Sequence, residues 1–166
     1  FRNDGGLDFE NASEEWGFTP PYNNTVAAAY ADLDNDGDLD MILNNIDTMA
    51  TMYRNTGREK GLGNYLQAKL IGKGKNTEGL GAKVEIKIRE NSQLFELGRT
   101  RGFAACVDAV VHFGIGKEKQ IDELTVTWLG GAQQTLRNIK ANQRLVLKEE
   151  NAVVVVKTPP KVEPAI

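Results

Sequence analysis

The feature that most constrains the fold is a succession of short runs in which apolar and polar residues alternate, each ended by turn residues. Alternation with a period of two is typical of half-buried strands, and no helical periodicity extends beyond a turn or two. The 17 glycines fall mostly between these runs, where a positive φ is needed. The chain is therefore expected to be all-β. The predicted strands are Val26–Asp32, Asp40–Asn44, Thr51–Asn55, Tyr65–Ile71, Ala82–Arg89, Leu94–Arg99, Val110–Gly114, Glu123–Trp128, Gln133–Leu136 and Arg144–Lys148.

One pair of runs carries a hairpin signal. Leu124–Trp128 and Gln133–Leu136 both alternate, and Gly130 and Gly131 lie between them. A Gly-Gly step between alternating runs is typical of a tight β-hairpin. We expect these two strands to pair directly.

Charge divides the 166 residues into two parts. Residues 1–60 hold 4 Lys/Arg against 12 Asp/Glu, whereas residues 61–166 hold 16 against 11. Such asymmetry indicates two units with different roles. Their junction falls in the Gly-rich segment GREKGLGN, residues 57–64. We expect a first unit at 1–57, a linker at 58–64, a second β unit at 65–149, and a tail or linker at 150–166 that holds three of the five prolines.

Several classes of protein are excluded by what the sequence lacks. Cys106 is the single cysteine and His112 the single histidine, so neither a disulfide framework nor a multi-Cys or multi-His metal site can form. No apolar run approaches the ~20 residues of a membrane span, and no signal peptide is visible. Lys69, Lys73 and Lys75 form a basic cluster without interleaved aromatics, so nucleic-acid binding is not expected.

The most specific chemistry lies in an acidic loop between two predicted strands. Carboxylates occur at relative positions 1, 3, 5 and 9, which are Asp32, Asp34, Asp36 and Asp40, and Gly37 at position 6 permits a sharp bend. Calcium takes six to eight oxygen ligands. We therefore predict one Ca²⁺ bound by these four side chains and by the backbone carbonyl of Asp38, whose own side chain would be free to face solvent.

An EF-hand is the obvious alternative for this loop, and it fails. That motif needs a bidentate Glu at position 12 and flanking helices, whereas position 12 is Leu43 and both flanks are predicted strands. A strand–loop–strand calcium hairpin remains. The remaining alternative is a solvated acidic turn without a metal, although five carboxylates without a neighbouring Lys or Arg would repel one another.

The segment AAAYADLDNDGDLDMILNN followed by YRNTG resembles an FG-GAP/VCBS repeat, the calcium-hairpin blade of integrin-like β-propellers. FRNDG at residues 1–5 recurs as YRNTG at 53–57, and repeats near 50 residues are typical of propeller blades. The resemblance implies that residues 1–57 are one partial blade and the end of another. We therefore expect upstream blades in a longer protein, and an open edge that packs against the second unit or another copy.

The second unit resembles ASPIC/UnbV domains. The motifs in order are NYLQAKL from Asn64, EGLGAKV from Glu78, Arg101-Gly-Phe103, HFGIG from His112, IDELTVTW from Ile121, QTLRNI from Gln134, and Ala141-Asn-Gln143. Such domains typically follow FG-GAP/VCBS repeats in secreted proteins similar to cartilage acidic protein. Ala104-Ala105-Cys106 depart from the small hydroxyl residues usual there. The resemblance implies a small β-sandwich or β-barrel and no established catalytic residues.

Read without the resemblance, residues of the second unit have structural roles. Gly79 and Gly81 are expected to shape a bulge or a turn, because a GxGxxG pattern and a following helix are both missing. His112, in an apolar run, is expected to be a hydrogen-bonded interior residue. Trp128 is expected to pack in or around the core, and Cys106 to be a small buried side chain.

The sequence thus favours a non-enzymatic, calcium-binding extracellular or cell-envelope module that contacts a protein or glycan partner. A carbohydrate-binding module is an alternative, with Trp128, Tyr65 or Phe103 as the sugar-stacking residue. A glycan-active enzyme is another, since glycosidases need two carboxylates across a cleft. The available acids are Glu78, Glu85, Glu96 and Asp108.

Overall fold

The computed structural model describes residues 1–18 and 24–154, and over these residues the fold is all-β, as predicted. Its helical content within this part of the chain is one short 3₁₀ turn, η1. No helix of the described part is long and apolar enough to cross a membrane. The elements are β1 (Arg2–Gly5), β2 (Asp8–Glu10), β3 (Thr25–Ala31), β4 (Asp40–Asn45), β5 (Thr51–Tyr53), β6 (Asn64–Ile71), β7 (Lys83–Ile88), β8 (Asn91–Glu96), β9 (Val110–Gly116), β10 (Gln120–Thr127), β11 (Ala132–Lys140), β12 (Gln143–Lys148), η1 (Glu149–Asn151) and β13 (Val153–Val154).

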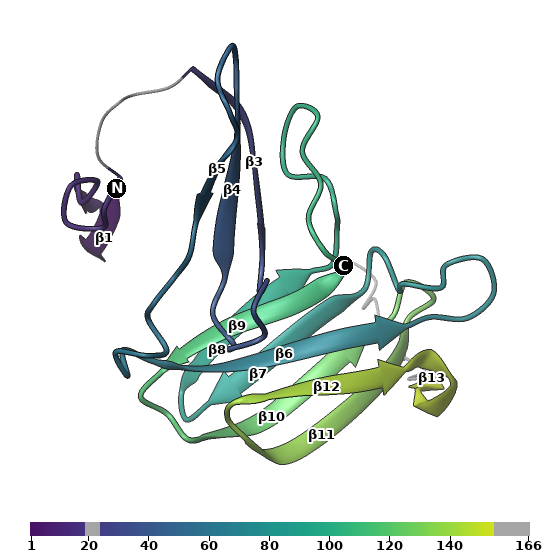
Figure 1. Ribbon diagram of the computed structural model, residues 1–166. Coiled ribbons are helices and arrows are strands. Elements are labelled where there is room, and N and C mark those ends of the chain that lie inside the picture. Colours follow the sequence, from purple (N-terminus) through teal and green to yellow (C-terminus); the bar gives the residue numbers. More distant parts are fainter. Residues whose placement is uncertain (19–23, 155–166) are drawn as a thin grey trace, which may run out of the picture.

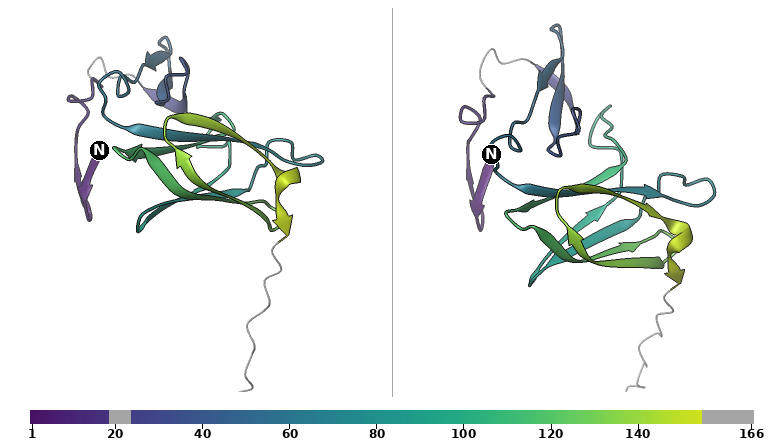
Figure 2. Two further views of the ribbon diagram at one scale, coloured as in Figure 1. Left: turned by 90° about the horizontal axis from the view of Figure 1, so that it is seen from below. Right: turned by 60° about the horizontal axis from the view of Figure 1, so that its bottom comes forward.

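Two sheets stack face to face in the second unit (Figures 1 and 2). One has the strand order β13-β11-β10-β7-β8 and the other β12-β6-β9. All neighbours run antiparallel except β12, which lies parallel to β6. Neither sheet closes on itself over the described residues, so of the two predicted shapes the unit is a sandwich and not a barrel.

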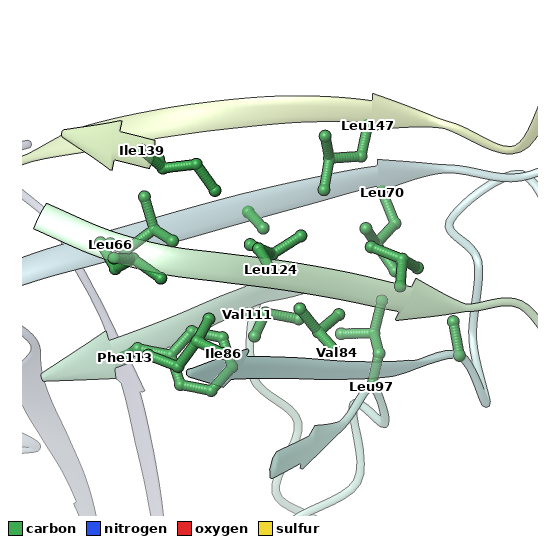
Figure 3. Packing of buried hydrophobic residues seen from close by; sticks show 14 of the residues in the cluster. Leu66, Leu70, Val84, Ile86, Leu97, Val111, Phe113, Leu124, Ile139 and Leu147 are labelled. Carbon is green, nitrogen blue, oxygen red and sulfur yellow. The ribbon is translucent and has the colours of Figure 1, made fainter. Parts of the chain in front are cut away.

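The core of this sandwich fills the space between the two sheets (Figure 3). Leu66, Ala68 and Leu70 alternate along β6 with side chains that point the other way, as the period of two requires. They meet Val84 and Leu124 of the opposite sheet, and all five are almost fully buried. Trp128 is also only 2% exposed, which confirms the predicted packing role.

A three-stranded antiparallel sheet, β3-β4-β5, forms the acidic unit. It stands on the outer side of the β12-β6-β9 sheet, with the β3–β4 turn directed at β6 (Figure 1). Contacts across this junction include Asp32 with Gln67 and Arg101 with Tyr30. The expected packing of the acidic unit against the second unit is therefore present, while β1 and β2 pair with each other as a separate hairpin.

Several strand bounds differ from the prediction. β8 begins at Asn91 because it leaves β7 through a tight turn in which Arg89 has a φ of +54°, a turn without glycine. β11 extends through a left-handed Asn138 to Lys140. The predicted hairpin forms, but its turn covers Trp128 to Gly131, with only Gly131 left-handed. Gly79 and Gly81 are left-handed turn residues as expected.

Two further expectations concern the loop before β9 and the end of the chain. Cys106 is exposed, so its predicted burial is wrong: alternation about the Thr100–Cys106 bridge turns Ala105 and Val107 inward instead. The predicted tail at 150–166 begins with η1 and with β13, which pairs with β11. Residues 155–166 lie outside the described part.

Candidate metal centre

The acidic loop joins β3 to β4 through a chain of side-chain-to-backbone turns. The Asp34 carboxylate accepts the Asp36 N–H at 3.2 Å, and the Asp36 carboxylate accepts the Asp38 N–H at 3.0 Å. Asx turns of this kind favour tight loops. Gly37 lies in the left-handed region at φ +98°, and Asn35 does so at +60°. The sharp bend predicted at Gly37 is therefore present, and it turns successive carboxylates toward one another.

Three of the carboxylates converge. Asp32, Asp34 and Asp36 each offer an oxygen within 4.8 Å of the others, the one such group in the described part of the chain. Buried oxygens without a hydrogen-bond partner occur on Asp32 (Oδ1), Asp36 (Oδ2) and Asp38 (Oδ1). Buried polar atoms are nearly always paired, so the unpartnered oxygens of Asp32 and Asp36 fit a cation bound in this cluster, whereas Asp38 and Asp40 lie outside the group of three.

Asp40 has a different environment from the other four. It is only 3% exposed, and both of its oxygens accept backbone N–H groups, from Leu33 at 3.0 Å and from Asn55 at 2.8 Å. These bonds tie the start of the loop to the chain beyond β5. In this geometry Asp40 braces the loop, and a carboxylate oxygen keeps a further lone pair for a metal.

Arginine relieves part of the loop's charge, contrary to the sequence-based expectation. Arg54 donates to Asp34 at 2.8 Å and also pairs with Glu59. The Arg54 hydrogen bond holds the pKa of Asp34 below its usual value. The register of β4 and β5 explains the pair: Met41 opposes Tyr53, so the residue after Tyr53 reaches the loop that precedes Met41.

The Asp38 side chain turns inward, so the expectation that it could face solvent is wrong. Its Oδ2 accepts the Arg58 N–H at 2.9 Å, and its Oδ1 is one of the three buried unpartnered oxygens. Burial raises the pKa of Asp38; the Arg58 N–H opposes this, and the charges of Asp36 and Asp40 add to it. A cation would stabilise the ionised form.

The sandwich meets this loop directly. Gln67 of β6 donates to Asp32 Oδ2 at 2.7 Å, and a Cβ on Gly37 would lie 1.9 Å from the Tyr65 ring. Tyr65 in turn stacks on His112, with ring centroids 5.9 Å apart. His112 is half-buried, 3.5 Å from Gln67, and its burial lowers its pKa. The predicted hydrogen-bonded histidine is thus present, beneath the loop rather than in the sandwich core.

The other candidate residues are scattered. Trp128 is buried and Tyr65 is covered by Gly37, whereas Phe103 is 88% exposed. Lys69, Lys73 and Lys75 are exposed on β6 and the loop after it. Among the acids, Glu78 pairs with Arg99, Glu96 pairs with Lys83, Asp108 lines a small cavity of about 30 Å³, and Glu85 lies on β7.

Four residues around the site were not predicted from the sequence: Gln67, Arg144, Arg54 and Arg58. The register of the β4–β5 hairpin, once these two strands are known, is enough to place Arg54 beside the acidic loop. Gln67 lies 35 residues from Asp32, and Arg144 lies 77 from Gln67, so no local pattern connects them. The aspartates of the loop thus form a cluster of hard oxygen donors, which suits a hard divalent cation.

Comparison with known proteins identifies the second unit. A model of the family described as ASPIC and UnbV matches residues 72–154, half of the chain. The matched segment begins just after β6 and runs to the end of β13, so it leaves the acidic loop outside. None of the curated proteins compared with the chain matches it.

Proposed function

The chain belongs to the ASPIC and UnbV family, and from this premise we propose that it is a calcium-binding, non-enzymatic interaction module of a secreted or cell-envelope protein. Ca²⁺ would bind in the β3–β4 loop through Asp32, Asp34 and Asp36, with Asp38 and Asp40 completing the protein ligands. The observation that carries this proposal is the set of three buried, unpartnered carboxylate oxygens on Asp32, Asp36 and Asp38. Calcium suits them because it accepts oxygen ligands in a flexible geometry.

We propose further that β3-β4-β5 is an FG-GAP/VCBS-type blade with other blades beside it. Support comes from the apolar side chains that this sheet leaves in solvent: Val26 is 45%, Ile42 38% and Met52 67% exposed, and Ile42 lies opposite Met52 in the register. Clustered exposed apolar surface marks an interaction site. Neighbouring blades of a longer chain would cover it, and a protein or glycan partner would then bind elsewhere on the assembly.

Calcium titration by calorimetry tests the metal site, with Asp36→Asn and Asp47→Asn as matched variants. Asparagine keeps the oxygen that accepts the Asp38 N–H but removes one unit of charge. Since a divalent ion gains about 2 kcal/mol from a unit charge at ~4 Å even in water, the dissociation constant should rise at least tenfold. Asp47 is exposed in the β4–β5 connection, at the opposite end of β4 from the acidic loop, so Asp47→Asn should leave the dissociation constant unchanged. Equal affinities for the two variants would refute the site.

Carbohydrate binding is a second candidate. A cavity of about 620 Å³ lies between the N-terminal segment and the β3-β4-β5 sheet, and aromatic residues line it, namely Trp16, Phe18, Tyr30 and Tyr53. This volume falls within the range of small-ligand sites. A glycan array separates the candidates: sugar binding that Trp16→Ala abolishes and a chelator leaves intact would favour the cavity.

A further inference from the structure

A row of three polar side chains crosses the outer face of the three-stranded sheet beneath the acidic loop. The register places Arg144 of β12 opposite Gln67 of β6, and Gln67 opposite His112 of β9. Side chains alternate along a strand, and the neighbours of Gln67, Leu66 and Ala68, point into the core. The row therefore faces the acidic unit.

Gln67 is the centre of this row. It is only 2% exposed, although burying an amide without hydrogen bonds is costly. Both of its ends are engaged: Arg144 Nε donates to its Oε1 at 2.6 Å, and its Nε2 donates to Asp32 Oδ2 at 2.7 Å. A guanidinium can only donate. Arg144 therefore fixes which end of the amide points at Asp32, and that end is the donor.

The consequence for Asp32 is that its two oxygens are made unequal. Gln67 donates to Oδ2, whereas Oδ1 is buried without a partner. Asp32 offers one carboxylate oxygen to the cluster with Asp34 and Asp36, and Oδ1 is the oxygen that no hydrogen bond occupies. The Tyr65 ring, packed against Gly37, holds the bend of the same loop. The sandwich thus fixes both the first carboxylate of the loop and its sharpest turn.

We propose that the sandwich sets the cation affinity of the acidic loop, with Gln67 as a positioning residue that Arg144 orients and that aims Asp32 Oδ1 at the ion. This inference rests on the proposed calcium site. Residues that hold a metal ligand from behind change metal affinity 10- to 100-fold when substituted. By linkage, an ion that favours the docked loop also strengthens the docking of the acidic unit on the sandwich.

The test is calorimetric titration of the full chain with CaCl₂, comparing Gln67→Met with Gln133→Met. Methionine has a similar length, leaves the net charge unchanged and cannot hold Asp32. We expect the dissociation constant to rise tenfold or more. Gln133 is half-buried, whereas Gln67 is fully buried, and it donates one hydrogen bond, to Thr127, in the other sheet. Its variant should change the constant less than twofold.

Arg144→Met gives a second, independent test, because positioning and simple electrostatics predict opposite changes in its calcium dissociation constant. Arg144 is exposed on β12, so the substitution opens no core. If the Coulomb repulsion between Arg144 and the cation were the only effect, removing this positive charge should strengthen cation binding. Positioning through Gln67 predicts the reverse, a dissociation constant raised about threefold or more.

The outcomes separate the two proposals. Thermal unfolding in chelator first establishes that Gln67→Met is folded. If that variant binds calcium as tightly as the unmutated chain does, the positioning role is refuted and the calcium site stands. Tighter calcium binding by Arg144→Met also refutes the positioning role. This measurement alone tests that role if Gln67→Met does not fold. If the unmutated chain binds no calcium, both proposals are refuted.

Discussion

At the scale of single residues, Gly37 shows how closely the acidic loop depends on its neighbour. Its φ of +98° is a conformation that residues with a side chain rarely adopt, and a Cβ there would lie 1.9 Å and 2.2 Å from two atoms of the Tyr65 ring. Glycine is needed both for the bend and for the approach of the loop to β6.

Gly37→Ala should accordingly destabilise the protein by about 2 kcal/mol or more, from left-handed strain and from displacement of Tyr65. Urea unfolding measures the change. Gly130→Ala is the matched control, because Gly130 has no positive φ and no atom within 4 Å of a Cβ there. Similar midpoints for the two variants would show that the loop does not pack on Tyr65.

The residue scale also shows what local sequence could and could not predict. The alternate spacing of Asp32, Asp34 and Asp36 just before Gly37 was enough to predict that their carboxylates converge, since loop geometry is local. The buried Gln67 was not predictable, because its polarity suggests an exposed position on β6 and its partners come from β3 and β12 by tertiary packing.

At the scale of elements, alternation predicted most strands of the sandwich because one face of each strand is buried and the other is not. It missed β1 and β2, whose residues are almost all exposed and carry no apolar period. The parallel pairing of β12 with β6 was also out of reach, since it joins residues 77 apart in sequence.

The central element of the core is β10, which pairs with β7 on one side and with β11 on the other. Leu124 on this strand is fully buried, so Leu124→Ala should cost about 2–5 kcal/mol in urea unfolding. Leu94→Ala on β8 removes the same atoms from a side chain that is 65% exposed, and should cost less than about 0.5 kcal/mol. A comparable loss from both would contradict the core assigned to the sandwich.

At the scale of the whole molecule, the acidic unit and the sandwich meet at the loop that carries the carboxylates. Asp32 contacts Gln67, Arg101 contacts Tyr30, and Arg58 joins Asp38 to the Gly63 carbonyl just before β6. The charge asymmetry of the sequence indicated two units, and the resemblance of the second to ASPIC/UnbV domains is confirmed by the family match. Their mode of contact emerged only in three dimensions, since it depends on the outer face of a sheet whose other face forms the core.

Because the folded loop gathers the carboxylates and an unfolded chain would not, calcium should stabilise the whole protein. The most direct measurement is thermal unfolding of the unmutated chain in calcium and in chelator. At calcium 100 times its dissociation constant, the gain is about 2.7 kcal/mol, a rise of roughly 5–10 °C in Tm for a chain of this size. We expect a calcium dissociation constant of the order of 10⁻⁴–10⁻³ M, the range in which calcium sites of extracellular modules bind. Superimposable curves, with no heat of calcium binding, would contradict the account and leave the loop a solvated acidic turn.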